Sequence, residues 1–407
     1  MPRTPLQLDE SYALRAAWAI PIDGEPIRHA QLIVEQGTIR ELTPAPGRPA
    51  DGVQTIDLGD VALLPGFVNA HAHLDFSDLR QPLGEPGVSL PEWIGQVFAY
   101  RAEPTRPAVA ERIALGCRQA AQSGTTLVGD VVAIDEPIAE PPLDWLPFRE
   151  LIGLTDDSVE ACATIARQFV SRHPSAGLSP HAPYTVRRDL LASLVQLSKE
   201  SGAPLMMHIA ETVEELQLLG AGQGPFAELL QARGVWSADQ FAGGLRCLDY
   251  LQLLSAAARA LVVHGNYLDD EELEFLASHS NRMALIFCPR THAYFRHPRH
   301  KIVEAAALGV QCAIGTDGRG SSPDLDMLAE LRTLAVTYAQ LSPEAILRMG
   351  TLNGAVALGC GEATGSLAAG KRANLVAVAI DANRWDEPRQ AVLFGDGKVT
   401  TTIHSPG

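Results

Sequence analysis

Residues 63–75 read LLPGFVNAHAHLD, an apolar run that ends in two histidines separated by one residue. The run has the length and composition of a buried strand, and side chains two positions apart on a strand point to the same side. His71 and His73 can therefore direct two ring nitrogens toward one metal ion. This stretch predicts a strand that ends in a metal site.

Three apolar runs further along the chain also end in a residue that can bind a metal or carry a proton. PLMMH ends in His208, ALVVH ends in His264, and VQCAIGTD ends in Asp317. In a (β/α)8 barrel the catalytic side chains project from the carboxyl ends of the strands. We therefore expect these side chains to meet those of the first run at one end of a barrel.

The middle of the chain alternates strand-like and helix-like segments, as such a barrel requires. Helix-like stretches cover residues 107–124, 157–173 and 187–202, and we interpret the Pro- and acid-rich residues 135–148 as a loop. The eight strand-like runs are LLPGFVNAH, TLVGDVV, LIGL, GLSPHAP, PLMMHIA, ALVVHG, ALIFCP and VQCAIGTD. The sequence thus predicts an α/β fold, a (β/α)8 TIM barrel over residues 63–362.

Both ends of the chain are rich in strand-like segments. QLIVEQGTIREL at 31–42 reads as a hairpin around a glycine, and AVLFGDGKVTTTI at 391–403 reads as two strands with another tight glycine turn. Neither end is long enough for a stable sheet alone. We therefore expect residues 1–62 and 363–407 to combine into one small β-sandwich domain.

Composition excludes several classes of protein. The 407 residues carry a formal net charge of −16, which argues against binding to nucleic acid or to an anionic membrane. No apolar run approaches the roughly 20 residues of a membrane span, and the N-terminus does not resemble a signal peptide. Six scattered cysteines without a Cys-x-x-Cys motif suit reduced thiols. We predict a cytoplasmic protein with a small-molecule substrate and leave open a homodimer.

The candidate ligands define the kind of metal site. His71, His73, His208 and Asp317 offer three imidazoles and one carboxylate, a set that suits one Zn²⁺ or Fe²⁺ ion with room for water. A second ion would need a bridging group such as a carbamylated lysine. The only lysine between His73 and His208 is Lys199, which falls in a helix-like segment. We therefore expect one divalent ion, Zn²⁺ before Fe²⁺.

Two further polar residues are candidates for catalysis. Glu211 follows the His208 strand by three residues, so a neutral carboxyl there can protonate a substrate. The alternative is a helix first-turn carboxylate stabilised by the helix dipole. His264 can orient the attacking water. Alternatively, His264 is only packed in the core.

These motifs together resemble the amidohydrolase superfamily. The matching phrases are PGFVNAHAHLD, HIAE, VVHGNYL and GTDG, and GSLAAGKRANLVAV is similar to the returning strands of its split β-sandwich. The branch with the greatest resemblance holds deaminases of cytosine, guanine and adenosine derivatives and the triazine hydrolases. The resemblance implies that the four candidate ligands bind the metal and that Glu211, His264 and Asp317 transfer protons.

Within that branch, two sets of motifs point to different substrates. SPHAPYTV, with His181, is similar to methylthioadenosine and S-adenosylhomocysteine deaminases, in which this histidine contacts the substrate. CPRTHAYF and SLPEWIGQVFAYR look more like aminodeoxyfutalosine deaminases, whose adenine nucleoside carries a benzoate. Arg290, His292 and Arg101 are the candidate partners of that carboxylate.

We therefore predict a metal-dependent hydrolytic deaminase of an adenine nucleoside, with aminodeoxyfutalosine of menaquinone biosynthesis as the first choice. The alternatives are a methylthioadenosine/S-adenosylhomocysteine deaminase, a guanine deaminase and a triazine hydrolase. A distant alternative of another class is a non-catalytic scaffold. A scaffold would be expected to lose ligands, and here none is lost.

Overall fold

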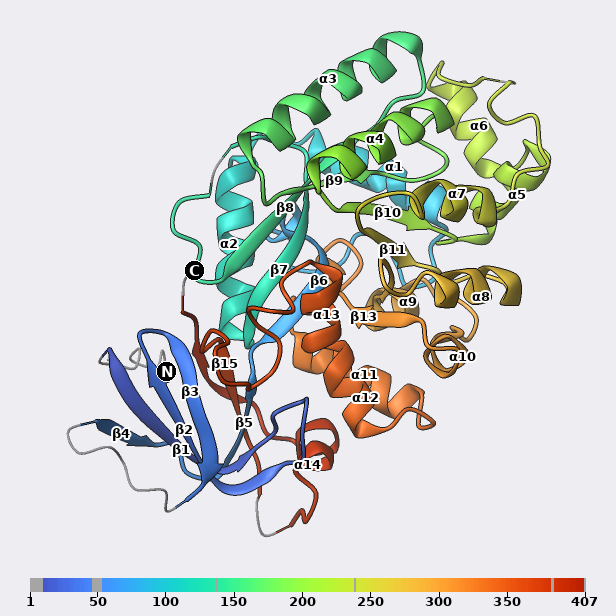
Figure 1. Ribbon diagram of the computed structural model, residues 1–407. Coiled ribbons are helices and arrows are strands. Elements are labelled where there is room, and N and C mark those ends of the chain that lie inside the picture. Colours follow the sequence, from blue (N-terminus) through green and yellow to red (C-terminus); the bar gives the residue numbers. More distant parts are fainter. Residues whose placement is uncertain (1–9, 46–52, 137, 238, 382–383, 406–407) are drawn as a thin grey trace.

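A parallel sheet forms the centre of the larger part of the molecule. The computed structural model describes residues 10–45, 53–136, 138–237, 239–381 and 384–405 (Figure 1). The nine parallel strands of this sheet are β6 Phe67–His73, β7 Thr125–Val132, β8 Asp144–Leu151, β9 Gly177–Pro180, β10 Leu205–Ile209, β11 Ala260–His264, β12 Met283–Phe287, β13 Gln311–Ile314 and β14 Asp317–Gly318.

The order of these strands confirms the predicted barrel. Strands β6 to β13 neighbour one another in chain order, and β14, which follows β13 directly, pairs with β6. The last strand of the series therefore returns to the first. Every strand end with a candidate site residue lies at the same edge, because all the pairs are parallel.

Helices cover the outside of this sheet. Thr155 and Asp269 each form a capping box at the start of a helix, and Gly202 ends another with a φ of 80°. The helices are η1 Leu74–Phe76, α1 Leu90–Arg101, α2 Val109–Gln122, α3 Asp156–Arg172, α4 Arg188–Ser201, α5 Val213–Ala221, α6 Pro225–Ala232, α7 Cys247–Leu254, α8 Asp270–Ser278, α9 Pro289–Tyr294, α10 Ile302–Ala307, α11 Met327–Thr337, α12 Pro343–Met349, α13 Leu352–Ala357 and α14 Pro388–Phe394.

The two chain ends meet in a second, mixed sheet, at the lower left of Figure 1. The predicted hairpin is confirmed: Glu35 pairs with Thr38, and Gln36 and Gly37 turn the chain with φ values of 48° and 72°. The seven strands are β1 Ser11–Ala19, β2 Ile27–Glu35, β3 Thr38–Pro44, β4 Gln54–Asp57, β5 Val61–Pro65, β15 Leu375–Ala379 and β16 Val399–Ile403.

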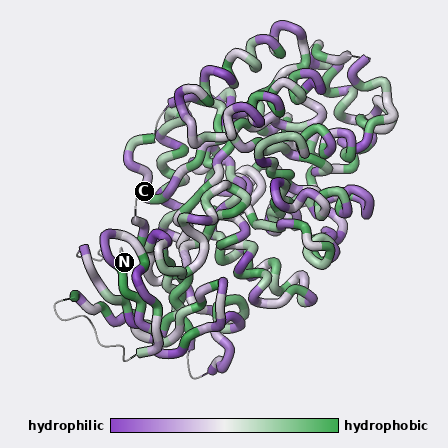
Figure 2. The backbone as a smooth tube through the Cα atoms, viewed as in Figure 1, coloured by the Kyte–Doolittle hydropathy of each residue, from purple (hydrophilic) through white to green (hydrophobic). Residues whose placement is uncertain are grey.

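The apolar core follows these two sheets. Every side chain of β7 and β10 is buried, as expected for strands that are covered on both faces. In Figure 2 the central strands are largely green, whereas the outer helices alternate green and purple along their length. A separate apolar cluster, which includes Leu14, Leu32 and Leu375, fills the small β domain.

Two segments differ from the prediction. Residues 144–148 begin β8 instead of forming a loop, because they pair in parallel with β7 and Trp145 donates a hydrogen bond to Asp130. Residues 391–394 form the end of α14 instead of a strand. Glu387 caps that helix, and Ala391 and Leu393 pack in the core. Both corrections reflect tertiary contacts that local sequence does not encode.

The domain limits, the cysteines and the membrane and signal-peptide predictions remain to be compared with the structure. The domain limits 1–62, 63–362 and 363–407 stay a prediction. The limit at 62/63 falls inside β5. All six cysteines are free thiols, and five are buried. Within the described ranges no helix is long and apolar enough to cross a membrane. The prediction about a signal peptide concerns residues 1–20, of which 1–9 lie outside the described residues.

Candidate metal and catalytic site

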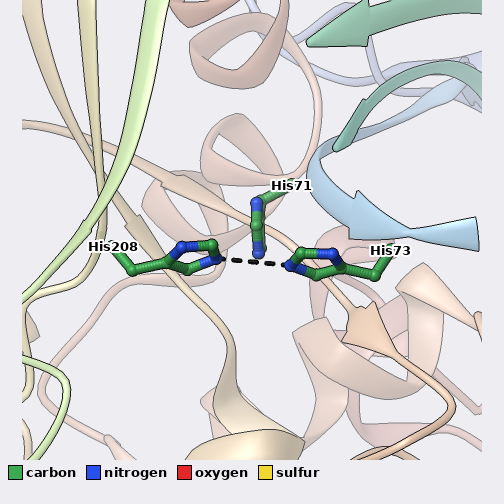
Figure 3. Close-up of side chains that lie close together, drawn as sticks. All are labelled: His71, His73 and His208. Carbon is green, nitrogen blue, oxygen red and sulfur yellow. Dashed lines mark hydrogen bonds between the residues drawn. The ribbon is translucent and has the colours of Figure 1, made fainter. Parts of the chain in front are cut away.

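Three imidazoles converge at the carboxyl edge of the barrel sheet (Figure 3). His71 and His73 come from the end of β6, and His208 comes from β10. One ligand atom of each ring lies within 4.8 Å of the others, and the side chain of His71 is fully buried. The expected convergence of these strand ends is therefore present.

Hydrogen bonds on the outer side of the rings leave the inner nitrogens free to bind a metal. His71 Nδ1 lies 3.1 Å from Met206 Sδ, and His208 Nδ1 lies 2.8 Å from the His181 carbonyl oxygen. If each Nδ1 carries the proton, each Nε2 presents a lone pair to the centre. Burial and the neighbouring imidazoles lower the pKa of His71 well below its usual value, so this ring is neutral, as a metal ligand must be.

The inner ring nitrogens show whether a cation fits between the three imidazoles. His71 Nε2 is buried and has no hydrogen-bond partner among the described residues. His73 Nε2 and His208 Nε2 approach to 3.3 Å. These two nitrogens can share a hydrogen bond if one of them carries a proton, or both can bind one cation, and a buried nitrogen without a partner is costly. The donor set therefore fits a divalent metal ion.

Asp317 adds a carboxylate to this group. Its Oδ1 lies 3.6 Å from His71 Nε2 and 3.8 Å from His73 Nε2, and its Oδ2 accepts a hydrogen bond from Ser321 Oγ at 2.8 Å. Burial opposes ionisation, but the surrounding imidazoles and Ser321 bring the pKa of Asp317 below its usual value. The group is therefore an ionised carboxylate, suited to bind a cation or accept a proton.

Glu211 and His264 face each other beside the three histidines. His264 Nε2 lies 3.5 Å from Glu211 Oε1, and both side chains are buried. Burial raises the pKa of Glu211 well above its usual value, and the nearby carboxylates of Asp317 and Glu215 add to this rise. A carboxyl group that holds its proton near neutral pH can act as a general acid.

The backbone at this edge is held in an uncommon conformation. Ala210, His264 and Asp317 have positive φ values of 54°, 69° and 55°, which are costly for residues with a side chain. Such strain persists where surrounding contacts impose it, and it clusters at functional sites. It supports a functional role for the residues around it.

Glu215 is a residue that the sequence prediction missed. Its two carboxylate oxygens each accept a hydrogen bond at 2.9 Å, one from the backbone N–H of Ala210 and one from that of Glu211. The side chain is completely buried. The only signal in the sequence is a second acidic residue one helical turn after Glu211, and that spacing is common on exposed helices.

A cavity of about 360 Å³ opens from this cluster and is large enough for a small molecule. Its inner end holds the candidate catalytic groups, and its walls are mostly apolar. The apolar lining includes Phe76, Trp93, Val97, Phe226, Leu229 and Phe295.

His181 and Arg101 line this cavity, as the sequence prediction requires of substrate-binding residues. His181 lies next to the metal cluster, with its ring centroid 5.1 Å from that of His208, and its Nδ1 lies 2.7 Å from Thr185 Oγ1. Arg101 forms an ion pair of 3.2 Å with Asp75.

The structure does not bring Arg290 and His292 to the cavity lining. The Arg290 guanidinium pairs with Asp324 at 2.6 Å, outside the pocket. The two ring nitrogens of His292 lie 3.0 Å from Asn266 Oδ1 and 2.8 Å from the Pro298 carbonyl oxygen. Both belong to α9, a helix of six residues that turns these side chains into the protein framework. Arg290 and His292 therefore do not lie where partners of a substrate carboxylate were expected.

Comparison with known proteins agrees with the fold and with the family that the sequence motifs resemble. A relative from Moorella thermoacetica, named 5-methylthioadenosine/S-adenosylhomocysteine deaminase, is 29% identical over 88% of this chain and 83% of its own. The solved structure of an adenosine deaminase from Xanthomonas campestris with bound zinc is 24% identical, with a TM-score of 0.78 over 99% of this chain and 93% of that one.

A third comparison is with Helicobacter pylori aminofutalosine deaminase, which is 22% identical, with a TM-score of 0.82 over 97% of this chain and 98% of that one. At such identities the solved structures show the fold alone. Residues 62–405 match the amidohydrolase family, a span that includes the whole barrel and the returning strands. The chain therefore belongs to the amidohydrolase family, hydrolases of carbon–nitrogen bonds other than peptide bonds.

Proposed function

We propose that this protein is a metal-dependent deaminase of 5′-substituted adenosines, of the methylthioadenosine/S-adenosylhomocysteine kind. Similarity along 88% of the chain to a deaminase with that name supports the proposal. So does a buried proton donor beside a donor set that fits a metal. The reaction replaces the amino group of the adenine ring with oxygen from water and releases ammonia.

Each candidate catalytic residue has a step that its surroundings favour. Asp317 Oδ1 accepts the proton of the attacking water and returns it to the departing amine. Glu211 donates its proton to the ring nitrogen next to the attacked carbon, which prevents negative charge from accumulating on the ring, and it recovers a proton from the added hydroxyl group when the carbonyl forms and ammonia leaves. His264 Nε2 faces Glu211 and stabilises the developing oxyanion.

His71, His73, His208 and Asp317 would hold the metal, and we propose one zinc ion per chain. The adenosine deaminase with a similar fold carries zinc, which supports this choice. A divalent ion supplies a Lewis acid that lowers the pKa of water toward neutrality. Elemental analysis should find one divalent ion per chain. Two ions per fully active chain would contradict the proposed ligand set.

The observation that carries the choice of substrate is the apolar character of the outer cavity. Beyond the polar cluster the lining includes Phe98 and Ile152, which are 44% and 49% exposed. Large apolar side chains at a cavity mouth commonly mark a binding surface. A methylthio group on the ribose fits these walls without a charged partner.

A second candidate substrate is an adenine nucleoside that carries a carboxylate, such as aminodeoxyfutalosine. The observation in its favour is Arg233, whose guanidinium lies over the Phe98 ring, 4.1 Å from its centroid. Among the described residues Arg233 forms no ion pair within 4.0 Å. Arg233 therefore replaces Arg290 as a candidate partner for a benzoate.

Ammonia release from a panel of substrates tests the proposal. We expect turnover of methylthioadenosine, S-adenosylhomocysteine and adenosine by the zinc-loaded protein, and little turnover of guanine. A preference for aminodeoxyfutalosine over methylthioadenosine would favour the second candidate. Turnover of none of the adenine nucleosides would refute the proposed function.

Two arginine variants separate the candidates further. If a substrate carboxylate binds at Arg233, Arg233→Met should lower kcat/KM for aminodeoxyfutalosine roughly ten- to 150-fold, the worth of a charge-assisted hydrogen bond. Methylthioadenosine should be little affected. Arg290→Met is the matched control, because that guanidinium lies outside the cavity.

A further inference from the structure

A buried histidine that the proposed mechanism does not use lies behind His264. His300 belongs to the segment between α9 and α10, and its ring Nε2 lies 2.9 Å from the backbone carbonyl oxygen of His264. The cavity lining does not include His300. Any effect of this residue on the reaction must therefore pass through a neighbour, and His264 is the neighbour to which its ring is bonded.

The hydrogen bond runs from the His300 ring to the His264 backbone. A carbonyl oxygen can only accept, so His300 Nε2 carries the proton. Burial lowers the pKa of His300 to about 3, so the ring is neutral and its Nδ1 carries no proton. This Nδ1 is buried and has no hydrogen-bond partner within the described ranges. The polar contact of the ring is therefore directed at His264.

The His264 carbonyl group lies where the pairing of two strands ends. The register of β11 with β12 stops at Val263, one residue earlier. His264 and Gly265 then both have positive φ values, 69° and 62°. A residue with a side chain rarely holds this conformation, which persists where surrounding contacts impose it. The hydrogen bond from His300 is such a contact.

The barrel framework fixes the position of His300. Its ring stacks on Phe287, the last residue of β12, with the ring centroids 4.1 Å apart. Its backbone N–H donates a hydrogen bond to Tyr338 Oη at 3.1 Å. Tyr338 is buried and directly follows α11. His300 thus connects β12 and α11 to the backbone of His264.

We infer that His300 is a positioning residue for His264. Its hydrogen bond holds the His264 backbone in the left-handed conformation, and this keeps the His264 ring beside the metal cluster, 3.5 Å from Glu211. The inference rests on the proposed function and deepens it, because it adds a residue outside the cavity on which turnover depends.

The supports of Glu211 are separate from this contact. The backbone N–H of Glu211 donates to Glu215 Oε2 at 2.9 Å, and its carbonyl oxygen accepts a hydrogen bond from Asn266 Nδ2 at 3.0 Å. Loss of the His300 donor should therefore displace His264 while the proton donor stays in place.

Substitutions that keep or remove the donor test the inference. His300→Phe retains a ring to stack on Phe287 but has no donor. With the adenine nucleoside that the wild type turns over fastest, we expect kcat to fall roughly ten- to 100-fold, the cost of a small misplacement of a catalytic group. KM and zinc content should change little. His300→Gln should recover most of the kcat, because its amide can place an N–H donor near the position of Nε2.

A double-mutant cycle separates positioning from a general loss of structure. A residue that acts only through His264 has nothing left to act on once that ring is removed. In a His264→Ala background, His300→Phe should therefore lower kcat no further. A second loss by the same factor in that background would overturn the inference.

Two more variants complete the test. His297→Phe is the matched control, because His297 lies in the same segment and its Nδ1 contacts Tyr267 Oη at 3.1 Å instead of His264, so kcat should be kept. If His300→Phe does not fold, His300→Asn replaces it, since its shorter amide does not reach the His264 carbonyl. A comparison of Asn with Gln then varies reach alone.

The remaining outcomes are distinct. Wild-type kcat in His300→Phe, equal losses in the Gln and Phe variants, or a loss of zinc that accompanies the loss of turnover would each overturn the inference while the proposed function stands. If the zinc-loaded wild type released ammonia from no adenine nucleoside, the proposed function would fail, and the role of His300 in that reaction would fail with it.

Discussion

Glu211 is the residue whose surroundings most clearly assign it a chemical task. Burial raises its pKa well above the usual value, and the carboxylates of Asp317 and Glu215 add to the rise, so it holds a proton that a substrate can take. Glu211→Gln should keep the metal and the fold but lower kcat about 10²–10⁴-fold, the usual contribution of general acid catalysis. Steady-state ammonia release together with metal content measures both effects.

Glu211 also leads to a prediction for how kcat changes on the alkaline side of the pH profile. The proton-donating form of Glu211 is lost as the pH rises through its pKa, so kcat should fall on that side. Glu214→Gln is a matched control, because Glu214 is a half-buried neighbour that bonds to Thr212 outside the catalytic cluster. Near-wild-type turnover in Glu211→Gln would mean that Glu211 is only a carboxylate at a helix start.

Single residues also show what sequence can predict. The positions of His71, His208 and Asp317 follow from the sequence because each comes at the end of an apolar strand, and parallel strands place their ends together. Glu215 was missed for the opposite reason. Its role depends on which way its side chain points after the chain has folded, and it does not lie in a distinctive local pattern.

The junction of β13 and β14 packs closely against His71 of the candidate metal site. Gly315 lies between these strands, and a Cβ there would meet the His71 carbonyl oxygen at 2.7 Å and the His71 Cβ at 2.9 Å. Gly315→Ala must therefore displace β6 or β14. We expect about 1–3 kcal/mol of lost stability, typical of overpacking, and a lower zinc content.

Thermal unfolding and elemental analysis of Gly315→Ala measure the two effects. Gly220→Ala in α5 is the control, because a Cβ there meets no atom within 4 Å and alanine favours a helix. If Gly315→Ala bound zinc and unfolded like the wild type, the close packing of His71 against β13 and β14 would not matter for the site.

Short elements are where the sequence prediction of the fold was weakest. The barrel strands are apolar runs between long amphipathic helices, and they were recognised by that pattern. Helix α9 has only six residues, too few for a helical period to indicate which side chains face the cavity. The expected contact of Arg290 with a substrate carboxylate therefore had no support from periodicity, and its partner Asp324 lies 34 residues away in sequence.

At the scale of the whole molecule, Asp144 joins the barrel to the small β domain. It begins β8 and pairs with Arg372 at 2.8 Å and with His404 at 3.1 Å, both from the C-terminal part of the chain. Burial opposes ionisation, but the hydrogen bonds from His404 and Arg372 bring the pKa of Asp144 below its usual value of 3.8. The ionised carboxylate therefore stabilises the folded protein.

Asp144→Asn should lower the free energy of unfolding at pH 7 by roughly 1.5–3 kcal/mol, the value of a hydrogen bond between charged groups. Because the folded-state pKa is depressed, this difference is present in full well above pH 3.8 and is lost as the pH falls below 3.8 and through the lower folded-state pKa. Urea unfolding across this range measures it. Asp156→Asn, which removes an exposed partner of Arg187, should cost less than about 1 kcal/mol.

A difference for Asp144→Asn that did not change with pH would contradict an electrostatic contact between the two parts. The meeting of the chain ends was itself predictable, because neither end can form a stable sheet alone. The charged contact was not, since 228 residues separate Asp144 from Arg372.

The reaction proposed for this protein hydrolyses the amino group from the adenine ring of a 5′-substituted adenosine. Turnover of methylthioadenosine by the zinc-loaded protein in water enriched in heavy oxygen tests it most directly. We expect 5′-methylthioinosine with the heavy oxygen on the purine carbon that carried the amine, together with one equivalent of ammonia. Release of free adenine, or no turnover by protein with a full complement of zinc, would contradict it.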